Sequence, residues 1–139
     1  MKKNSLDISA SIKWLESGKI LIHPTESIWG LGCDAFNKKA VENIFAIKKR
    51  DQKKSFILLC ESLDFLKEYA DKIAKEDEIL LNETWPGAVT FLVKYNNKLP
   101  EHLKTSSGKI AVRVSNHLPL KHLIASFKSF MVSTSANLS

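Results

Sequence analysis

The sequence predicts an α/β domain built around a mixed β-sheet. Short apolar runs typical of strands alternate with amphipathic helical segments along most of the chain. Residues 88–94 and 109–115 are two such runs with a polar connection and no helix between them, which favours a mixed rather than a purely parallel sheet. The 139 residues are 44% hydrophobic and 26% charged, as expected for one soluble domain, and no repeat or linker divides residues 1–139.

The first half of the chain is divided by residues that end helices and strands. Apolar side chains recur at helical spacing before Gly18, which favours a helix end there. Pro24 cannot donate to a β-ladder and so ends the first apolar strand, and Asn37 is a favourable N-cap for the next helix. The expected elements are a helix over 5–17, a strand over 19–23, a loop with two glycines over 24–32, a helix over 37–48 and a strand over 56–60.

The second half continues the alternation. Residues 109–115 alternate between two faces, as a strand requires, and Pro119 is tolerated in the first turn of a helix. The expected elements are helices over 62–69 and 71–83, a turn over 85–87, a strand over 88–94, a polar connection over 95–108, a strand over 109–115, a helix over 119–127 and a strand over 130–133. The three tryptophans, Trp14, Trp29 and Trp85, are expected in the core.

Charge and cysteine content narrow the functional class. Basic residues exceed acidic ones, 21 against 15, and the net charge of +6 suits partners that carry phosphate. The two cysteines form no CxxC spacing, which indicates a reduced cytoplasmic protein, and Cys33 is expected to pack rather than to react. No apolar run is long enough to span a bilayer or to form a secretory signal, so no membrane partner is expected.

Several common catalytic motifs are absent from the sequence. Gly30 and Gly32 lack the third glycine of a dinucleotide-binding fingerprint, and neither a phosphate-binding GxxxxGK[ST] loop nor a GxSxG nucleophile motif occurs. The four histidines are too dispersed to have metal-ligand spacing. The sequence therefore predicts no metal site and no covalent nucleophile.

The basic run Lys-Lys-Arg-Asp-Gln-Lys-Lys over residues 48–54 is the first candidate site. A solvated helix end explains it simply, because cations favour the partial negative charge of a helix C-terminus. Lys48, however, takes a position where the helix pattern predicts an apolar residue, so its stem is expected to point toward the core side. With Arg50 two residues later, the run could form a clamp for a phosphate or a carboxylate.

Two further features have both a structural and a functional explanation. Arg113 projects from an apolar strand: at a sheet edge it would be an ordinary surface arginine, whereas in a central strand it would line a pocket and need an anion. Residues 133–137, Ser-Thr-Ser-Ala-Asn, could place hydroxyl and backbone donors around an anion. Ordinary turn chemistry explains the same residues equally well.

Five motifs in one order resemble the YrdC/Sua5 family, the threonylcarbamoyl-AMP synthases of tRNA modification, and the bacterial single-domain branch is most similar. The motifs are His-Pro-Thr-Glu-Ser-Ile-Trp-Gly-Leu-Gly-Cys-Asp-Ala over 23–35, Lys48-x-Arg50 with Lys54, Trp-Pro-Gly-Ala-Val-Thr over 85–90, Ile-Ala-Val-Arg-Val over 110–114 and Ser-Thr-Ser-Ala-Asn-Leu-Ser over 133–139. The resemblance implies a twisted sheet with a concave, basic cavity.

The resemblance also implies a reaction, in which L-threonine, bicarbonate and ATP form threonylcarbamoyl-AMP and pyrophosphate for the t6A modification of tRNA. Mg2+ is expected with ATP, and tRNA and other proteins of that pathway are expected as partners. Matching positions imply a catalytic clamp of Lys48 and Arg50, an ATP site of Arg50, Lys54, Ser135 and Asn137, and a threonine site of Thr25, Ser27, Arg113 and Ser133.

The chain departs from the family pattern at a few positions. Asp51 stands where the family usually has proline, Lys54-Ser-Phe replaces a common Lys-Pro-Leu, and residues 58–60 lack a histidine found in some members. Family chains continue beyond Ser-x-Asn, so we expect this chain to lack the usual C-terminal segment. Two alternative functions remain: a non-catalytic basic module that binds tRNA or double-stranded RNA, and an inactive shortened relative.

Overall fold

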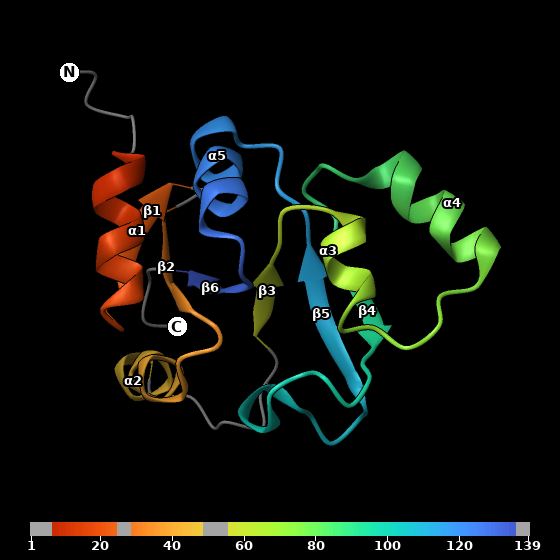
Figure 1. Cartoon of the computed structure of the whole chain (residues 1–139), viewed down its shortest axis with the longest axis horizontal. Helices are drawn as coiled ribbons and strands as arrows, with labels where there is room; N and C mark the ends of the chain where they lie inside the picture. The colour runs from red at the N-terminus through yellow and green to blue at the C-terminus, as the bar shows by residue number, and fades with distance from the viewer. Residues whose placement is uncertain (1–6, 25–28, 49–55, 136–139) are drawn as a thin grey trace.

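The computed structural model describes residues 7–24, 29–48 and 56–135, which form a six-stranded sheet flanked by helices (Figure 1). The strands are β1 (Leu21–Pro24), β2 (Trp29–Asp34), β3 (Ile57–Leu59), β4 (Phe91–Lys94), β5 (Lys109–Arg113) and β6 (Met131–Ser135). The helices are α1 (Ile8–Glu16), α2 (Lys38–Lys48), α3 (Leu63–Lys67), α4 (Lys75–Thr84) and α5 (Leu118–Phe127), with a 3-10 turn, η1 (Glu101–Leu103).

The sheet is mixed, as the sequence predicts. Its strand order is β1-β2-β6-β3-β5-β4. β3 and β5 are parallel, whereas the other neighbouring strands are antiparallel. The α/β class is therefore confirmed. None of the helices among the described residues is both long and apolar enough to cross a membrane.

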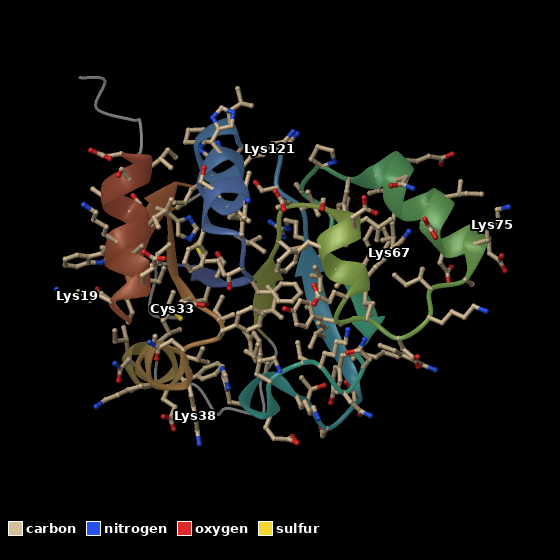
Figure 2. All side chains as sticks on the ribbon, in the orientation of Figure 1. Lys19, Cys33, Lys38, Lys67, Lys75 and Lys121 are labelled. Carbon is tan, nitrogen blue, oxygen red and sulfur yellow. The ribbon has the colours of Figure 1, made fainter. Side chains whose placement is uncertain are left out.

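Apolar side chains form a cluster on each face of the sheet. One face buries Cys33, Leu58, Val112 and Val132, which lie in one row across four strands and pack with apolar residues of α2 and α3. Cys33 lies inside the molecule, whereas several labelled lysines extend outward (Figure 2). The second cluster joins α1 and α5 to the other face of the sheet.

Residues 29–34 form strand β2, so the prediction of a loop over 24–32 is wrong in its last part. Gly32 there serves close packing rather than a turn. A Cβ on Gly32 would lie 2.8 Å from Cε of Met131 and 3.0 Å from Cδ2 of His23. Glycine within a strand often marks such a close approach. The crowding comes from residues in two other strands.

Local signals for helix ends are confirmed where side chains cap the backbone. Oδ1 of Asn37 accepts a hydrogen bond from the N–H of Ala40 at 3.0 Å, as an N-cap does, and Gly18 has a φ of +82° after α1. The expected helix over 71–83 begins later, at Lys75. The N–H of Asp71 donates to the carbonyl of Lys94 at 2.8 Å, which holds the chain extended beside β4 before α4 begins.

Tryptophan burial is predicted correctly at one of the two positions whose side chains are described. Trp85 is buried and stacks edge-on against Phe91, with 5.5 Å between the ring centroids. Trp14 is 44% exposed, so its expected core position is wrong. Its indole N–H donates to the carbonyl of Ile20 at 2.7 Å, and the Lys19 ammonium lies 4.3 Å from the ring centroid. The side chain of Trp29 lies outside the described residues.

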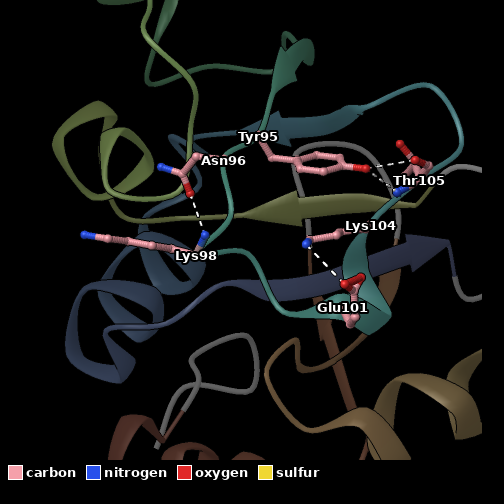
Figure 3. A network of polar contacts seen from close by, with 6 residues as sticks. All are labelled: Tyr95, Asn96, Lys98, Glu101, Lys104 and Thr105. Atoms are coloured by element: carbon pink, nitrogen blue, oxygen red, sulfur yellow. Dashed lines mark hydrogen bonds and ion pairs between the residues drawn. The ribbon is translucent and has the colours of Figure 1, made fainter.

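The polar connection between β4 and β5 is ordered by its own side chains (Figure 3). The Tyr95 hydroxyl donates to the carbonyl of Thr105 at 2.8 Å and accepts from the N–H of Thr105 at 3.0 Å. Lys104 and Glu101 form an ion pair at 3.3 Å. These contacts join residues within the connection to one another and support the register in which Lys94 lies opposite Lys109.

Candidate functional site

One face of the sheet carries Ser133 on β6 and Arg113 on β5, the two predicted site residues whose side chains the structure describes. Registered partners in neighbouring strands share a face, as do residues two apart in one strand. Ser133 pairs with Ile57, and Ile57 pairs with Ala111. Arg113 is two residues beyond Ala111, so it shares the face of Ser133, with the two Cα atoms about 12 Å apart by strand spacing.

Arg113 lies in the interior of the sheet. β5 is located between β3 and β4 in the strand order, which excludes the edge-strand explanation for this arginine. Its Nε and Nη2 donate to Oγ1 of Thr90 at 3.0 and 2.9 Å. The guanidinium is thus partly buried and restrained by a hydroxyl, and its planar fork is the geometry that binds a carboxylate through two hydrogen bonds.

Ser133 contacts a buried histidine that sequence reasoning did not connect with it. Nε2 of His23 lies 3.4 Å from Oγ of Ser133, although the two residues are 110 positions apart. His23 belongs to β1 and Ser133 to β6, so β2 lies between them. The bare backbone of Gly32 leaves room for the imidazole, whose Cδ2 a Cβ there would approach to 3.0 Å. The sequence feature that could have indicated this contact is the pair of glycines at alternate positions of one strand.

The remaining predicted site residues lie partly or wholly outside the described residues. Only the backbone is described for Lys48, the last residue of α2, and for Ser135, which pairs with Gly30. The expected position of the Lys48 stem is thus untested. The residues wholly outside the described part are Thr25, Ser27, Arg50, Lys54 and Asn137. That the basic run and residues 133–137 meet in one cavity therefore stays a prediction.

The two cysteines are unsuited to nucleophilic catalysis. Burial raises the pKa of the Cys33 thiol to about 12, with a further contribution from the neighbouring Asp34 carboxylate. Burial likewise raises the pKa of Cys60 to about 12. The thiolate is the reactive form, and a thiol with this pKa stays protonated at neutral pH. The expectation that Cys33 packs rather than reacts is consistent with its complete burial.

Two grooves lie away from this sheet face. One, of about 390 Å³, runs between α4 and the edge strand β4, and the other, of about 340 Å³, lies between α2 and η1. Arg113 and Ser133 line neither groove. Within residues 7–24, 29–48 and 56–135, no group of three or more His, Cys, Asp or Glu side chains could hold a metal ion. The concave basic cavity also stays a prediction.

Comparisons with known proteins identify relatives that match nearly the whole chain. The sequence profile of the Sua5/YciO/YrdC family, described as "Telomere recombination", matches residues 13–139. The chain is 40% identical over 134 residues to the threonylcarbamoyl-AMP synthase of Pseudoalteromonas translucida (strain TAC 125), covering 95% of this chain and 72% of that protein.

Solved structures are similar over nearly the whole chain. Sua5 of P. abyssi, complexed with L-threonine, superposes with a TM-score of 0.87 at 30% identity, over 95% of this chain and 39% of that one. YciO of E. coli superposes with a TM-score of 0.80 at 27% identity, over 91% of this chain and 62% of that one. The chain thus spans less than two thirds of each of these two structures. The profile match, the sequence identity and the shared fold together show that the chain belongs to the Sua5/YciO/YrdC family.

Proposed function

We propose that this chain is a threonylcarbamoyl-AMP synthase, a nucleotidyltransferase that joins L-threonine, bicarbonate and ATP. The observation that carries the proposal is the placement of Arg113 and Ser133 on one sheet face, with the arginine already oriented by Thr90. The name of the relative from Pseudoalteromonas translucida and the L-threonine complex of P. abyssi Sua5 support the same substrate class.

The threonine site is proposed to use both described residues. A guanidinium presents parallel N–H donors that match a carboxylate, so Arg113 would bind the α-carboxylate of threonine. Ser133, held against His23, would contact the rest of the amino acid. A separation of about 12 Å between the two Cα atoms leaves room for one small ligand between an extended arginine and a serine. Thr25 and Ser27 are proposed to complete this site.

The chemistry needs no covalent enzyme intermediate. The threonine amine reacts with bicarbonate to give a carbamate and water. A carbamate oxygen then attacks the α-phosphorus of ATP, the bond from that phosphorus to the bridging oxygen breaks, and pyrophosphate leaves. The protein has to bring two anions together and to stabilise the charge that develops on pyrophosphate. The protonated state of Cys33 and Cys60 agrees with a mechanism that uses no thiolate.

The nucleotide site is proposed from the basic run and the end of β6. Lys48 and Arg50 would stabilise the triphosphate charge. Phosphate oxygens are ligands that Mg2+ prefers, so ATP itself would bring the ion into the site. The full proposed set for ATP is Arg50, Lys54, Ser135 and Asn137, with Lys48 and Arg50 as the catalytic pair. We further propose a cytoplasmic location and, as partners, tRNA and other proteins of the t6A pathway.

Pyrophosphate release tests the proposal. The full chain is mixed with ATP, Mg2+, bicarbonate and L-threonine, and release is expected only when threonine and bicarbonate are both present. L-valine, which replaces the hydroxyl with a methyl group, is the matched control substrate and is expected to support little release. A folded chain that releases no pyrophosphate would contradict the proposal. ATP binding that does not respond to threonine, together with RNA binding that weakens steeply with salt, would favour the RNA-binding alternative.

A further inference from the structure

The hydroxyl of Thr90 accepts two hydrogen bonds from Arg113. Phe91 pairs with Val112 across β4 and β5, so the preceding residue, Thr90, lies directly opposite Arg113. Two donors of the guanidinium, on Nε and Nη2, converge on the single Oγ1 atom at 3.0 and 2.9 Å. Two hydrogen bonds from one edge of the planar guanidinium restrain both its position and its plane.

The segment before Thr90 is built to hold that hydroxyl in place. Trp85 is buried, and its indole N–H donates to the carbonyl of Val89 at 2.8 Å. The N–H of Gly87 donates to the carbonyl of Val114, the residue after Arg113, at 2.8 Å. The segment is thus tied to β5 next to the arginine that Thr90 contacts.

The glycine in this segment has a steric reason. A Cβ on Gly87 would lie 2.8 Å from the backbone carbonyl oxygen of Thr84, which a side chain could not avoid by rotating. The tight turn brings the chain from the end of α4 back to the sheet within a few residues. The motif over residues 85–90 therefore acts as one unit: a buried ring anchors it, a glycine permits the turn, and a threonine ends it.

We propose that Thr90 is a positioning residue that makes the site selective for the carboxylate of its amino-acid substrate. This inference rests on the proposed function, because it assumes that Arg113 binds that carboxylate. A carboxylate can accept hydrogen bonds from two parallel N–H donors at once, whereas a neutral amide has one acceptor oxygen, so a guanidinium held in the correct plane strengthens the preference for the carboxylate. Thr90 restrains that plane. Without its hydroxyl, the guanidinium loses the two hydrogen bonds to Oγ1 that hold it against β4.

Three variants of the full chain test the role of Thr90. Thr90→Val keeps the shape and removes the acceptor, whereas Thr90→Ser keeps the acceptor. Thr84→Val is the matched control, because it removes a threonine hydroxyl that bonds only within α4, to the carbonyl of Leu80. The assays are the KM for L-threonine, the KM for ATP, the relative use of L-threonine and L-threonine amide, and calorimetric binding of L-threonine.

Thr90→Val is expected to raise the KM for L-threonine about ten-fold, since the acceptor of two hydrogen bonds from a charged group is lost, and to leave the KM for ATP unchanged. Its preference for L-threonine over L-threonine amide is expected to fall by a similar factor. Thr90→Ser is expected to restore both values, and Thr84→Val to match the parent. A purely structural role would not change the discrimination between carboxylate and amide.

The outcomes separate this inference from the proposed function. If the parent chain binds threonine but Thr90→Val keeps its KM and its carboxylate preference, Thr90 has no positioning role. If Thr90→Val fails to fold, Thr90→Ala and Thr90→Ser are compared by the same ratio of threonine to threonine amide, and equal ratios would contradict the inference. If the parent chain neither binds threonine nor releases pyrophosphate, the proposed function is wrong and the inference is wrong with it.

Discussion

Nε2 of His23 lies 3.4 Å from Oγ of Ser133, and this contact crosses a strand that has no side chain in the way. The imidazole is completely buried beside Gly32 of β2. A histidine at the end of β1 therefore reaches a residue of the proposed threonine site. The contact links the N-terminal strand to the C-terminal strand of the described sheet.

Gly32→Ala is expected to destabilise the protein by about 1–3 kcal/mol, as overpacking of a buried site does. The added methyl group would lie within 3.0 Å of both Met131 and the His23 ring, so one of them must move. Chemical denaturation measures the change. Asn116→Ala, on an exposed position, serves as the control and is expected to change stability by less than about 0.5 kcal/mol. Equal stability of Gly32→Ala and the parent would show that the site can rearrange freely.

Replacing Arg113 is expected to weaken threonine binding and to leave the binding of ATP alone unchanged. A hydrogen bond to a charged group contributes about 1.5–3 kcal/mol, which corresponds to roughly 10- to 150-fold in affinity. Arg113→Lys keeps the charge but loses the planar fork, so it is expected to rescue Arg113→Gln only in part. Isothermal calorimetry with each ligand measures both effects. Full rescue by lysine would show that charge, and not geometry, is what the site needs.

Lys48→Ala and Arg50→Ala are each expected to weaken ATP binding, by about 1.5–3 kcal/mol for a lost charge-assisted contact. Lys75→Ala is the control, because Lys75 is exposed at the start of α4, far along the chain from the basic run (Figure 2). Calorimetric titration with ATP and Mg2+ measures the difference. If both variants bind ATP as tightly as Lys75→Ala does, the basic run is only a solvated helix end.

The buried thiols predict a loss of stability at alkaline pH. Burial raises the pKa of Cys33 and of Cys60 from 9.0 to about 12, so the folded state holds these protons more tightly than the unfolded state. Their contribution is fully present below pH 9 and is lost as the pH rises from about 9 to about 12. Denaturation between pH 8 and about 11 measures the slope. The double variant Cys33→Ala, Cys60→Ala is expected to have a shallower slope, and an unchanged slope would contradict the assignment.

Features that depend on neighbouring residues in the chain could be predicted from the sequence. The alternation over residues 109–115 correctly predicts β5, and Asn37 caps α2 as its position indicates. The family resemblance came from short motifs in a fixed order, and the family is confirmed. The charge pattern also singled out Arg113, whose interior position the structure then established.

Features that depend on distant partners could not be predicted in this way. The sequence predicts a loop with two glycines over 24–32, whereas residues 29–34 form β2, and the reason for glycine at position 32 lies in the His23 and Met131 side chains that crowd it. The partnership of Thr90 with Arg113 depends on the register between β4 and β5. No property of a single segment specifies that register.

The bridge between Ala70 and Tyr95 has a consequence for solubility. β4 ends the sheet, and an open strand edge can recruit other molecules into intermolecular β-structure. Backbone hydrogen bonds from Asp71 to Lys94 and from Asn96 to Tyr69 cover the far end of that edge. The uncovered stretch beside Leu92, itself 68% exposed, is short, and Lys94 adds a charge at its border. We therefore expect residues 69–71 to limit the pairing of this edge with strands of other molecules.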